Sequence, residues 1–424
     1  MKPTWAKINR RDIGLALLVT VVAAVLLILG WMRPVERPLS DLLLRTAGHL
    51  SSASSPVSAV VIDDRSVEAV GPLPWARDDL ATLVGRIAEH EPRVLIIDML
   101  FPEERTPDGD ALLEAELAKL DTILVAVLSP DGGWLLPIDR FGGAAAAAHG
   151  HAETDTDGVV RCISTTKQAN GLALPALALV AAQRAGWSRP IAPGRRIFPD
   201  FRQAPEDIPQ ISAADLLADS AKRPELITDR LVFLGYSASG TTDQYLVPVG
   251  KRNHPIPGVL VHAAATSSAL QGGLLRPLPT WAAIALAFLV AWATQSLRSS
   301  SGRFRLLHIC AVSCAVVLTA VGALWLANVL IPAFALIVAA SLSTGMREAV
   351  ESKQAQAETG AILSSLIEEE GVQSSVRVPR GVHGRLAQVK NLQGSLSRDR
   401  KSMKSEASTP AGRSTVSSRR GSCE

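Results

Sequence analysis

The chain has 424 residues, of which 47% are hydrophobic and 4% aromatic, and its formal net charge is +3. It has four cysteines, and only Cys162 lies in the large polar block between the apolar segments, which excludes a domain held together by disulfides. The charge is unevenly distributed: residues 33–277 carry 23 basic and 30 acidic residues, whereas residues 347–424 carry 13 basic and 9 acidic residues.

The first apolar segment, residues 13–32, contains no charged residue. About 20 residues suffice to cross a hydrocarbon core roughly 30 Å thick. A cleaved signal peptide is the alternative, but the run is long for one and no A-x-A-like site follows it directly. Trp31 and Arg33 at its end are typical of a membrane interface. We therefore predict an uncleaved transmembrane helix at 13–32, preceded by a cytoplasmic N-terminus at 1–12.

Residues 33–277 show the pattern of an α/β domain. Continuous apolar and β-branched runs predict buried strands at 57–62, 93–98, 122–128 and 230–235. Apolar periodicity predicts helices at 78–90, 111–120, 173–185, 211–218 and 258–273. Ser212 is expected to cap the fourth of these helices, and Asp157-Gly158 is expected to turn into a strand at 158–166. The alternation of strands and helices predicts a doubly wound, largely parallel sheet.

Polar residues follow three of these strands. Open parallel sheets bind ligands in the crevice at the carboxyl ends of their strands. If the strands at 57–62, 93–98 and 230–235 are neighbours, their polar residues converge there. Trp75 and Arg77 are added because they could bind a ligand by stacking and charge, although packing is an equal alternative. The candidate ligand-binding residues are Asp63, Asp64, Arg65, Ser66, Trp75, Arg77, Asp98, Tyr236, Ser237, Ser239 and Asp243.

The run GYSAS at 235–239 offers an enzymatic alternative. It follows a strand and resembles the nucleophile elbow of serine hydrolases, with Ser237 as the nucleophile. However, Ser239 stands where that motif requires glycine, and Asp243 and His262 are poorly spaced as triad partners. We expect no catalytic residues in this chain.

A local cluster of side chains between the third and fourth predicted strands offers a metal-binding alternative. Two histidines at i and i+2 of an extended segment point the same way, as metal ligands can. The acidic residues partly fit a calcium loop, but Ser164 stands where a bidentate Glu is needed. We expect no metal and no other cofactor. The cluster consists of His149, His151, Glu153, Asp155 and Asp157.

Three further membrane helices are predicted after the polar block. Residues 278–297 form one apolar span. Residues 306–346 contain no charged residue other than His308, and their length suits two helices of about 20 residues. Asn328 marks the turn between them, which gives spans at 306–325 and 329–346.

The basic segments that flank these four predicted helices test the layout against the positive-inside rule. The basic N-terminus, the loop with Arg298 and Arg303, and the flank at Arg347 all lie in the cytoplasm if the chain crosses the membrane four times. The acidic block 33–277 then lies outside. We therefore predict a multi-pass protein of the bacterial inner membrane, with residues 33–277 on the periplasmic side.

The motifs of the polar block occur in an order that resembles a known family. They are VVIDDRSVEAVGPLPWARDDLATLVGRI, PRVLIIDMLFPE, GHAETDTDGVVRC, LVFLGYSASGTTDQYLVPV and PGVLVHAAATSSALQGG. This order resembles the second type of the CHASE domain (cyclases/histidine kinases associated sensory extracellular domain). The resemblance implies an extracytoplasmic sensor of an unknown small molecule, a homodimer, and an output enzyme such as a histidine kinase or a nucleotide cyclase.

The C-terminal region departs from that family. Residues 347–370 are predicted to form a connector helix, because Ile362, Leu363, Leu366 and Ile367 share one face. Residues 371–424 are rich in Ser, Arg, Lys and Gly and are predicted to be disordered. They contain no aromatic residue for stacking on bases, so we expect contact with anionic lipid and not with nucleic acid.

The region after 346 shows no kinase glycine boxes and no cyclase carboxylate pair, so we expect no catalytic output domain in this chain. The predicted function is a membrane sensor for an unknown small-molecule ligand. Its expected partners are membrane lipid, a second copy of the chain, and a separate kinase or cyclase output protein. The alternatives are the serine hydrolase described above and a truncated, non-signalling remnant of a sensor kinase or cyclase.

Overall fold

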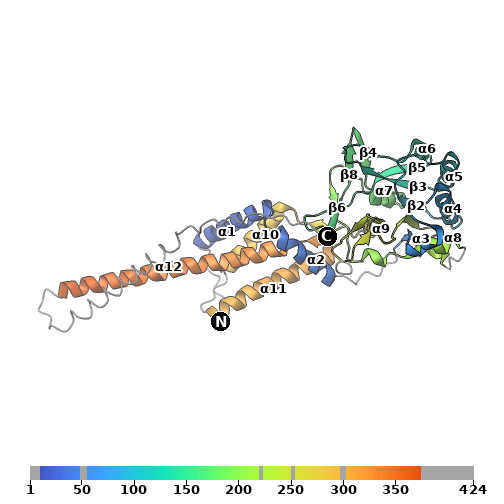
Figure 1. Cartoon of the computed structure of the whole chain (residues 1–424). Helices are drawn as coiled ribbons and strands as arrows, with labels where there is room; N and C mark the ends of the chain where they lie inside the picture. Colours follow the sequence, from blue (N-terminus) through green and yellow to red (C-terminus); the bar gives the residue numbers. More distant parts are fainter. Residues whose placement is uncertain (1–9, 48–54, 219–222, 250–253, 297–301, 374–424) are drawn as a thin grey trace, which may run out of the picture. The chain divides into compact units, whose positions relative to one another are not determined.

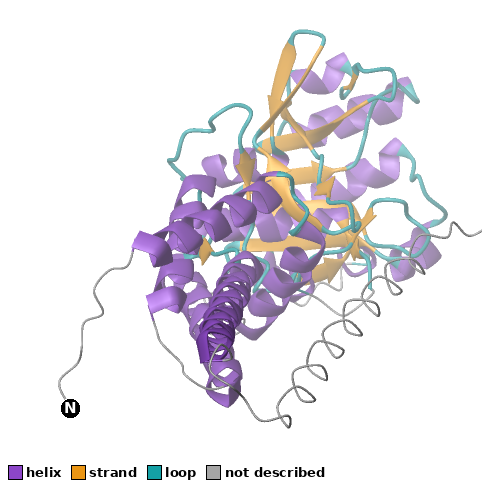
Figure 2. Cartoon of the chain, turned by 90° about the vertical axis from the view of Figure 1, so that its left-hand side faces the viewer, coloured by secondary structure: helices purple, strands orange, loops and turns teal. Residues whose placement is uncertain are grey.

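The computed structural model describes residues 10–47, 55–218, 223–249, 254–296 and 302–373 (Figures 1 and 2). The chain divides into two units, residues 1–347 and 348–424, each described by itself. The first unit contains the α/β domain and the apolar helices. Of the second unit, the structure describes the C-terminal part of helix α12.

A seven-stranded sheet forms the centre of the α/β domain. Its strand order is β11-β1-β12-β2-β3-β4, and β5 also pairs with β3. Every pair in it is parallel except β3–β4. The domain is thus mixed α/β with a partly parallel sheet, the class predicted from the sequence. The strands are β1 (Val57–Ile62), β2 (Val94–Asp98), β3 (Thr122–Leu128), β4 (Trp134–Leu135), β5 (Ala145–His149), β11 (Gln210–Ser212) and β12 (Leu231–Tyr236).

Helices cover both faces of this sheet, and Figure 2 shows its strands in orange among the purple helices. Side chains alternate along β1: Val60 and Ile62 are buried on one face, and Ala59 and Val61 on the other. Burial of apolar surface stabilises the fold by about 25 cal/mol per Å², so the side chains buried on both faces stabilise the sheet between its helices. One face carries α4 (Arg77–Ala88), α5 (Pro107–Leu117) and α8 (Ala213–Leu217), and the other carries α7 (Leu177–Arg184) and α9 (Gly258–Leu270).

Several elements differ from the predicted ones. The polar residues that follow β1 begin a short helix, α3 (Asp64–Val70), which is not among the predicted helices. The helix expected at 173–185 begins at Leu177, because β9 (Leu172–Pro175) pairs with β8 (Thr166–Ala169). Ser212 precedes α8 but makes no side-chain cap, because its hydroxyl instead donates to the carboxylate of Asp63 at 2.8 Å.

An antiparallel hairpin of β6 and β7 surrounds the Asp157-Gly158 turn. Gly158 has a φ of +78°, which glycine adopts without steric cost. The remaining short elements are helices α2 (Arg33–Ala47) and α6 (Asp139–Gly142), the 3-10 turns Pro205–Asp207 and Pro224–Leu226, and strands β6 (Glu153–Thr154), β7 (Val160–Ser164), β10 (Arg196–Ile197), β13 (Gln244–Tyr245) and β14 (Ile256–Pro257).

Among the residues that the structure describes, four apolar helices lie outside the α/β domain. Three of them contain stretches long and apolar enough to cross a membrane, at Arg11–Ile28, Leu307–Ala327 and Ala333–Leu366. The fourth is shorter, with an apolar stretch at Thr280–Gln295. α1 and α10 lie side by side, and all four contribute to one buried apolar cluster (Figure 1). The helices are α1 (Arg10–Ile28), α10 (Thr280–Ser296), α11 (Gly302–Ala327) and α12 (Ala333–Gln373).

The last predicted membrane span and the predicted connector belong to one helix. α12 runs without interruption from Ala333 to Gln373, so no break separates 329–346 from 347–370. Residues 329–330 are instead strand β16 (Val329–Leu330), which pairs with β15 (Arg276–Pro277). Asn328 has a φ of +53° at the predicted turn. The predicted tail at 371–424 lies outside the described residues, apart from the end of α12, as do residues 1–9 of the predicted cytoplasmic N-terminus.

Candidate functional site

The three strands whose polar ends define the predicted crevice are neighbours. β12 lies between β1 and β2, with Ile62 opposite Tyr236 and Gly235 opposite Asp98. The residues that follow these strands therefore reach the same edge of the sheet. There they divide into two groups, one at α3 and one at α9.

The α3 group consists of side chains bound to one another. Asp63 precedes α3 and accepts hydrogen bonds from the amide and hydroxyl of Ser66, at 2.9 and 2.6 Å, and from Ser212. Burial opposes ionisation of Asp63, but these hydrogen bonds outweigh it and lower the pKa of Asp63 below its usual value. Asp63 and Ser66 therefore join α3 to α8.

The exposed side of α3 is also internally paired. Asp64 accepts hydrogen bonds from the amide and hydroxyl of Ser239, at 2.7 and 2.8 Å. Arg65 forms an ion pair with Asp215 at 2.7 Å, and the Arg65 side chain is 65% exposed. These contacts hold the loop after β12 and helix α8 against α3.

Trp75 and Arg77 lie in the core and not in the crevice. Trp75 is 2% exposed, and its indole donates to the carbonyl of Gly71 at 2.9 Å. Arg77 is 4% exposed, pairs with Asp110 at 2.9 Å, and lies 4.6 Å above the ring of Phe101. Both side chains are packed in the core and have internal partners. The sequence alone could not distinguish packing from ligand contact for Trp75 and Arg77.

Tyr236 packs in the core, whereas Ser237 follows the end of β12. Tyr236 packs against the core on the α4 face of the sheet, and burial raises the pKa of its hydroxyl. The amide of Ser237 donates to Ile62 at 3.0 Å. Within the part of the chain that the structure describes, no hydrogen bond joins the Ser237 hydroxyl to a histidine or a carboxylate. That arrangement does not support the nucleophile that a hydrolase elbow requires.

The α9 group contains the partly buried carboxylate of Asp98. Its Oδ2 atom is shielded from solvent and has no hydrogen-bond partner among the described residues. Two glycines bring backbone close to it: a Cβ atom on Gly150 would lie 3.4 Å from Asp98 Oδ1, and one on Gly235 would lie 3.4 Å from Asp98 Cβ. Asp98 is therefore held closely from two sides.

His262 of α9 belongs to this group, although it is not among the ligand residues predicted from the sequence. It is 1% exposed, and its Nε2 lies 3.0 Å from the carbonyl oxygen of Gly150. Its Nδ1 is buried with no partner among the described residues. His262 stands in an apolar helical run, so only the fold reveals that it faces a strand end.

Asp243 reaches the same place from the loop after β12. Its carboxylate lies against the first residue of α9, since a Cβ atom on Gly258 would come within 2.1 Å of Asp243 Oδ2. Asp243 also accepts a hydrogen bond from the hydroxyl of Tyr245. Burial, together with Asp243, raises the pKa of Tyr245.

Burial and these neighbours together determine the pKa of Asp98. Burial raises the pKa of Asp98 to about 6, the attraction of His262 lowers it, and the negative charge of Asp243 raises it further. Carboxyl groups with such perturbed pKa values cluster at functional sites. Of the α3 group and the α9 group, the α9 group is therefore the stronger candidate for a functional site.

The cluster that offered the metal-binding alternative makes internal contacts. His151 Nε2 accepts from the amide of Leu128 at 2.6 Å, and His149 Nε2 lies 3.1 Å from the carbonyl of Ser164. Burial lowers the pKa of His149 to about 3, so its ring is neutral. Among the described residues, no group of three or more His, Cys, Asp or Glu side chains has the arrangement of a metal site.

Arg161 joins the α/β domain to the helix that follows α1. It pairs with Asp41 of α2 at 2.7 Å, and with Asp155 and Asp157 of the β6–β7 hairpin at 2.8 and 2.7 Å. Arg37 of α2 binds Asp155 in turn, at 2.8 Å. The Arg161 side chain is 13% exposed and that of Asp41 is 11% exposed, so their ion pair is the most shielded of the three, whereas the Asp157 side chain is 38% exposed.

A second set of contacts joins the domain to the turn between α11 and α12. Arg202 donates to the carbonyl of Leu324 at 3.3 Å and to the side chain of Asn328. The amide of Arg276 donates to the carbonyl of Asn328 at 2.7 Å, beside the β15–β16 pair. Glu36 of α2 accepts from the amide of Ala335, in the first turn of α12, at 3.1 Å.

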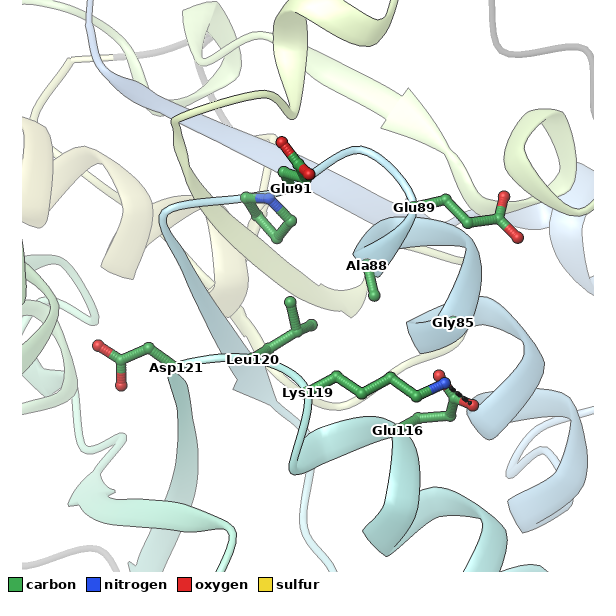
Figure 3. Close-up of a pocket in the computed structure, with 9 residues that line it drawn as sticks. Gly85, Ala88, Glu89, Glu91, Glu116, Lys119, Leu120 and Asp121 are labelled. Carbon is green, nitrogen blue, oxygen red and sulfur yellow. Dashed lines mark hydrogen bonds and ion pairs between the residues drawn. The ribbon is translucent and has the colours of Figure 1, made fainter.

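A surface hollow of about 580 Å³ lies at the opposite edge of the sheet, where β2 and β3 begin (Figure 3). Glu91, Glu116, Lys119 and Asp121 line it, and Figure 3 shows the ion pair between Lys119 and Glu116 across its lower side, at 2.6 Å. None of the predicted ligand residues lines this hollow.

An α/β domain with apolar helices before and after it defines the class of this protein. A model of the CHASE2 domain matches residues 17–297, from α1 to the end of α10. The chain therefore belongs to the CHASE2 family of extracytoplasmic sensor domains, which are sensory and not catalytic. Neither the curated proteins nor the solved structures gave a match.

Proposed function

We propose that this protein is a multi-pass sensor of the bacterial inner membrane, with its CHASE2 domain on the periplasmic side. It detects a chemical signal at the strand ends beside α9 and relays that signal through four membrane helices. The proposal is supported by the family, by the apolar helices, and by the basic residues that flank them on one side.

The observation that carries the relay is the Arg161 cluster. Arg161 fixes the β6–β7 hairpin of the domain to α2, which directly follows α1 in the chain. Arg202 and Glu36 make corresponding contacts at the end of α11 and the start of α12. A shift within the domain would therefore move the ends of three membrane helices together. A signal acts on such a system by its different affinity for two arrangements.

The partners belong to the same proposal. A second copy of the chain would pair along α12, where Ile362, Leu363 and Leu366 are 60, 49 and 54% exposed. A separate kinase or cyclase would receive the output, because the CHASE2 domain itself is sensory. Anionic lipid would contact the basic residues after 346.

Cysteine accessibility tests the topology in intact cells. In a chain with its native cysteines replaced, Glu104→Cys places a thiol on the domain and Ser352→Cys places one on α12. Both positions are exposed. A membrane-impermeant maleimide should modify position 104 in cells with a permeabilised outer membrane, and position 352 only after the inner membrane is opened. The reverse pattern would overturn the proposed orientation.

A further inference from the structure

We infer that the signal read at the strand ends beside α9 is a proton, bound by Asp98 opposite His262 and Asp243, so that the protein senses extracytoplasmic acidity. This inference rests on the proposed function and names its input. The reaction is the protonation of one carboxylate by hydronium ion from the solution outside the membrane, and it leaves a carboxylic acid and water. It requires no other reactant.

The first step is the space around Asp98. Asp98 lies within ordinary packing distance of two glycines: a Cβ atom on Gly150 would lie 3.4 Å from Asp98 Oδ1, and one on Gly235 would lie 3.4 Å from Asp98 Cβ. Oδ2 is shielded from solvent and has no hydrogen-bond partner among the described residues. A shielded carboxylate oxygen without a donor is costly to keep charged. A proton removes that charge and is the smallest ligand that can do so.

The second step is the set of ionisable groups that face Asp98 from each neighbouring element. α9 contributes His262, whose Nδ1 is buried without a described partner. The loop after β12 contributes Asp243, and β13 contributes Tyr245, whose hydroxyl binds Asp243. Asp98 is attracted to His262 and repelled by Asp243, so its own protonation changes both interactions at once.

The segment after β5 contributes the two histidines on either side of Gly150. Burial and neighbouring positive charge, including that of Lys167 on β8, lower the pKa values of both His149 and His151. Both rings are also engaged in hydrogen bonds to the backbone of other segments. His149, whose pKa is lowered to about 3, is therefore a neutral neighbour of Asp98 in weakly acidic solution, and the lowered pKa of His151 also disfavours its charged form.

The third step is the direction in which a change would travel. His262 and the Asp243 contact at Gly258 both lie on α9, which ends at Leu270. From there the chain passes through β15, paired with β16 beside α12, and then enters α10. Protonation removes a negative charge that holds His262 and repels Asp243. The resulting change in force acts on α9 and so on the start of a membrane helix.

The range of response follows from the same surroundings. Burial raises the pKa of Asp98 to about 6. The group is then mostly charged at about pH 7.5 and mostly protonated at about pH 5, since one pH unit on either side of a pKa changes the ratio of the two forms tenfold.

Infrared difference spectroscopy on the full chain in lipid nanodiscs measures this protonation directly. Acidification from about pH 7.5 to about pH 5 should produce the carbonyl band of a protonated carboxylic acid, with a midpoint near the pKa of Asp98. Asp98→Asn should lose the part of that band that has its midpoint at about pH 6. Asp121→Asn, at the opposite edge of the sheet, is the matched control and should retain it. Because burial also raises the pKa of Glu36, the outcome that overturns the inference is a band with unchanged amplitude and midpoint in Asp98→Asn.

Hydrogen–deuterium exchange on the same samples tests the consequence. In the parent chain, exchange of α9 and of residues 271–280, corrected for the intrinsic effect of pH, should change between the two conditions. Asp98→Asn, which resembles the protonated form, should show the low-pH pattern at both. If Asp98→Asn does not fold, Asp98→Glu replaces it, and an unchanged infrared midpoint in that variant overturns the inference.

The two proposals fail in different ways. If cysteine accessibility places the domain outside but Asp98→Asn titrates like the parent, only the proton inference fails. If position 104 proves cytoplasmic, the proposed function fails whatever the titration shows.

Discussion

Arg161 holds Asp41 in a two-point contact, with Nε 3.0 Å from Asp41 Oδ1 and Nη2 2.7 Å from Asp41 Oδ2. The planar guanidinium fits a carboxylate in this way, and such paired hydrogen bonds fix orientation as well as distance. Because Asp41 lies on α2 and Arg161 on β7, the contact sets the direction in which the domain meets the helix that follows α1.

Arg161→Ala should destabilise the full chain by about 2–4 kcal/mol, because it leaves three partly shielded carboxylates without their shared cation. Arg161→Lys should recover part of that loss, since lysine retains the charge and loses the two-point geometry. Thermal unfolding in nanodiscs measures both. A double-mutant cycle with Asp41→Ala should give a coupling energy on the order of 1–3 kcal/mol.

The ion pair of Arg65 with Asp215 provides the matched control. Its arginine side chain is 65% exposed, so Arg65→Ala should cost less than about 1 kcal/mol. Equal losses for Arg161→Ala and Arg65→Ala would show that the Arg161 cluster has no special role in joining the domain to α2.

The α/β class was predictable from the sequence because buried parallel strands are continuous apolar runs. Residues 57–62, 122–128 and 231–236 show this plainly. The strand β5 at Ala145–His149 was not found, because a run of alanines has no strand preference of its own. It pairs with β3 through tertiary context. Likewise α2 contains Pro38, which argues against a helix in local terms.

The candidate site was predictable only in part. Strand ends placed Asp98 and Asp243 correctly at one edge, because the carboxyl ends of adjacent parallel strands must meet there. Sequence order could not show that Asp63 caps α3, or that Arg77 pairs with a buried Asp110. Nor could it bring His262 from α9 to Gly150, 112 positions away. Such contacts depend on how the helices pack over the sheet.

Arg77→Ala should be among the most destabilising single changes in the domain. It removes the cation from the side chain of Asp110, which is 2% exposed and keeps only the backbone amide of Arg105 as a donor among the described residues, at a cost of about 3–5 kcal/mol. Replacing both partners by apolar residues, as in Arg77→Met with Asp110→Leu, should restore much of the stability. Thermal unfolding separates the cases. If Arg77→Ala folded as stably as the parent, its assignment to the core would be wrong.

Asp98 should make the stability of the chain depend on pH. Its pKa is raised from 3.8 to about 6 in the folded protein. A raised carboxyl pKa means that the folded state binds the proton more tightly than the unfolded state does. The associated stability is fully present below the unfolded pKa of 3.8, and it is lost as pH rises through about 6.

Asp98→Asn should therefore raise the free energy of unfolding at about pH 7.5 by roughly 1–3 kcal/mol, because it removes a charge that is unfavourable in the folded state. It should also flatten the dependence of unfolding temperature on pH between 4 and 7. Calorimetry in nanodiscs over that range gives both quantities. A variant less stable than the parent at neutral pH would show that charged Asp98 has a partner that stabilises it.

Asp243→Asn should shift the same titration. The negative charge of Asp243 raises the pKa of Asp98, so its removal should lower that pKa and move the infrared midpoint to lower pH. Asp215→Asn, on the α8 side of the sheet edge, is the control and should leave the midpoint unchanged. A midpoint that rises in Asp243→Asn would mean that Asp243 acts on Asp98 through structure and not through charge.

Glu36 should stabilise the start of α12. Its carboxylate accepts a hydrogen bond from Ala335 at the end of a helix where unpaired amides and the helix dipole favour a negative charge. Glu36→Ala should cost about 1–2 kcal/mol and increase deuterium exchange in the first turn of α12. Burial raises the pKa of Glu36, so the folded chain holds the Glu36 proton more tightly than the unfolded chain does, and acid by itself should not loosen the first turn of α12 in the parent. Glu36→Gln keeps an acceptor oxygen without the charge, so it should protect this turn better than Glu36→Ala does. If all three chains protect the first turn of α12 equally, α2 does not hold this helix through Glu36, and the relay depends on Arg161 and Arg202 alone.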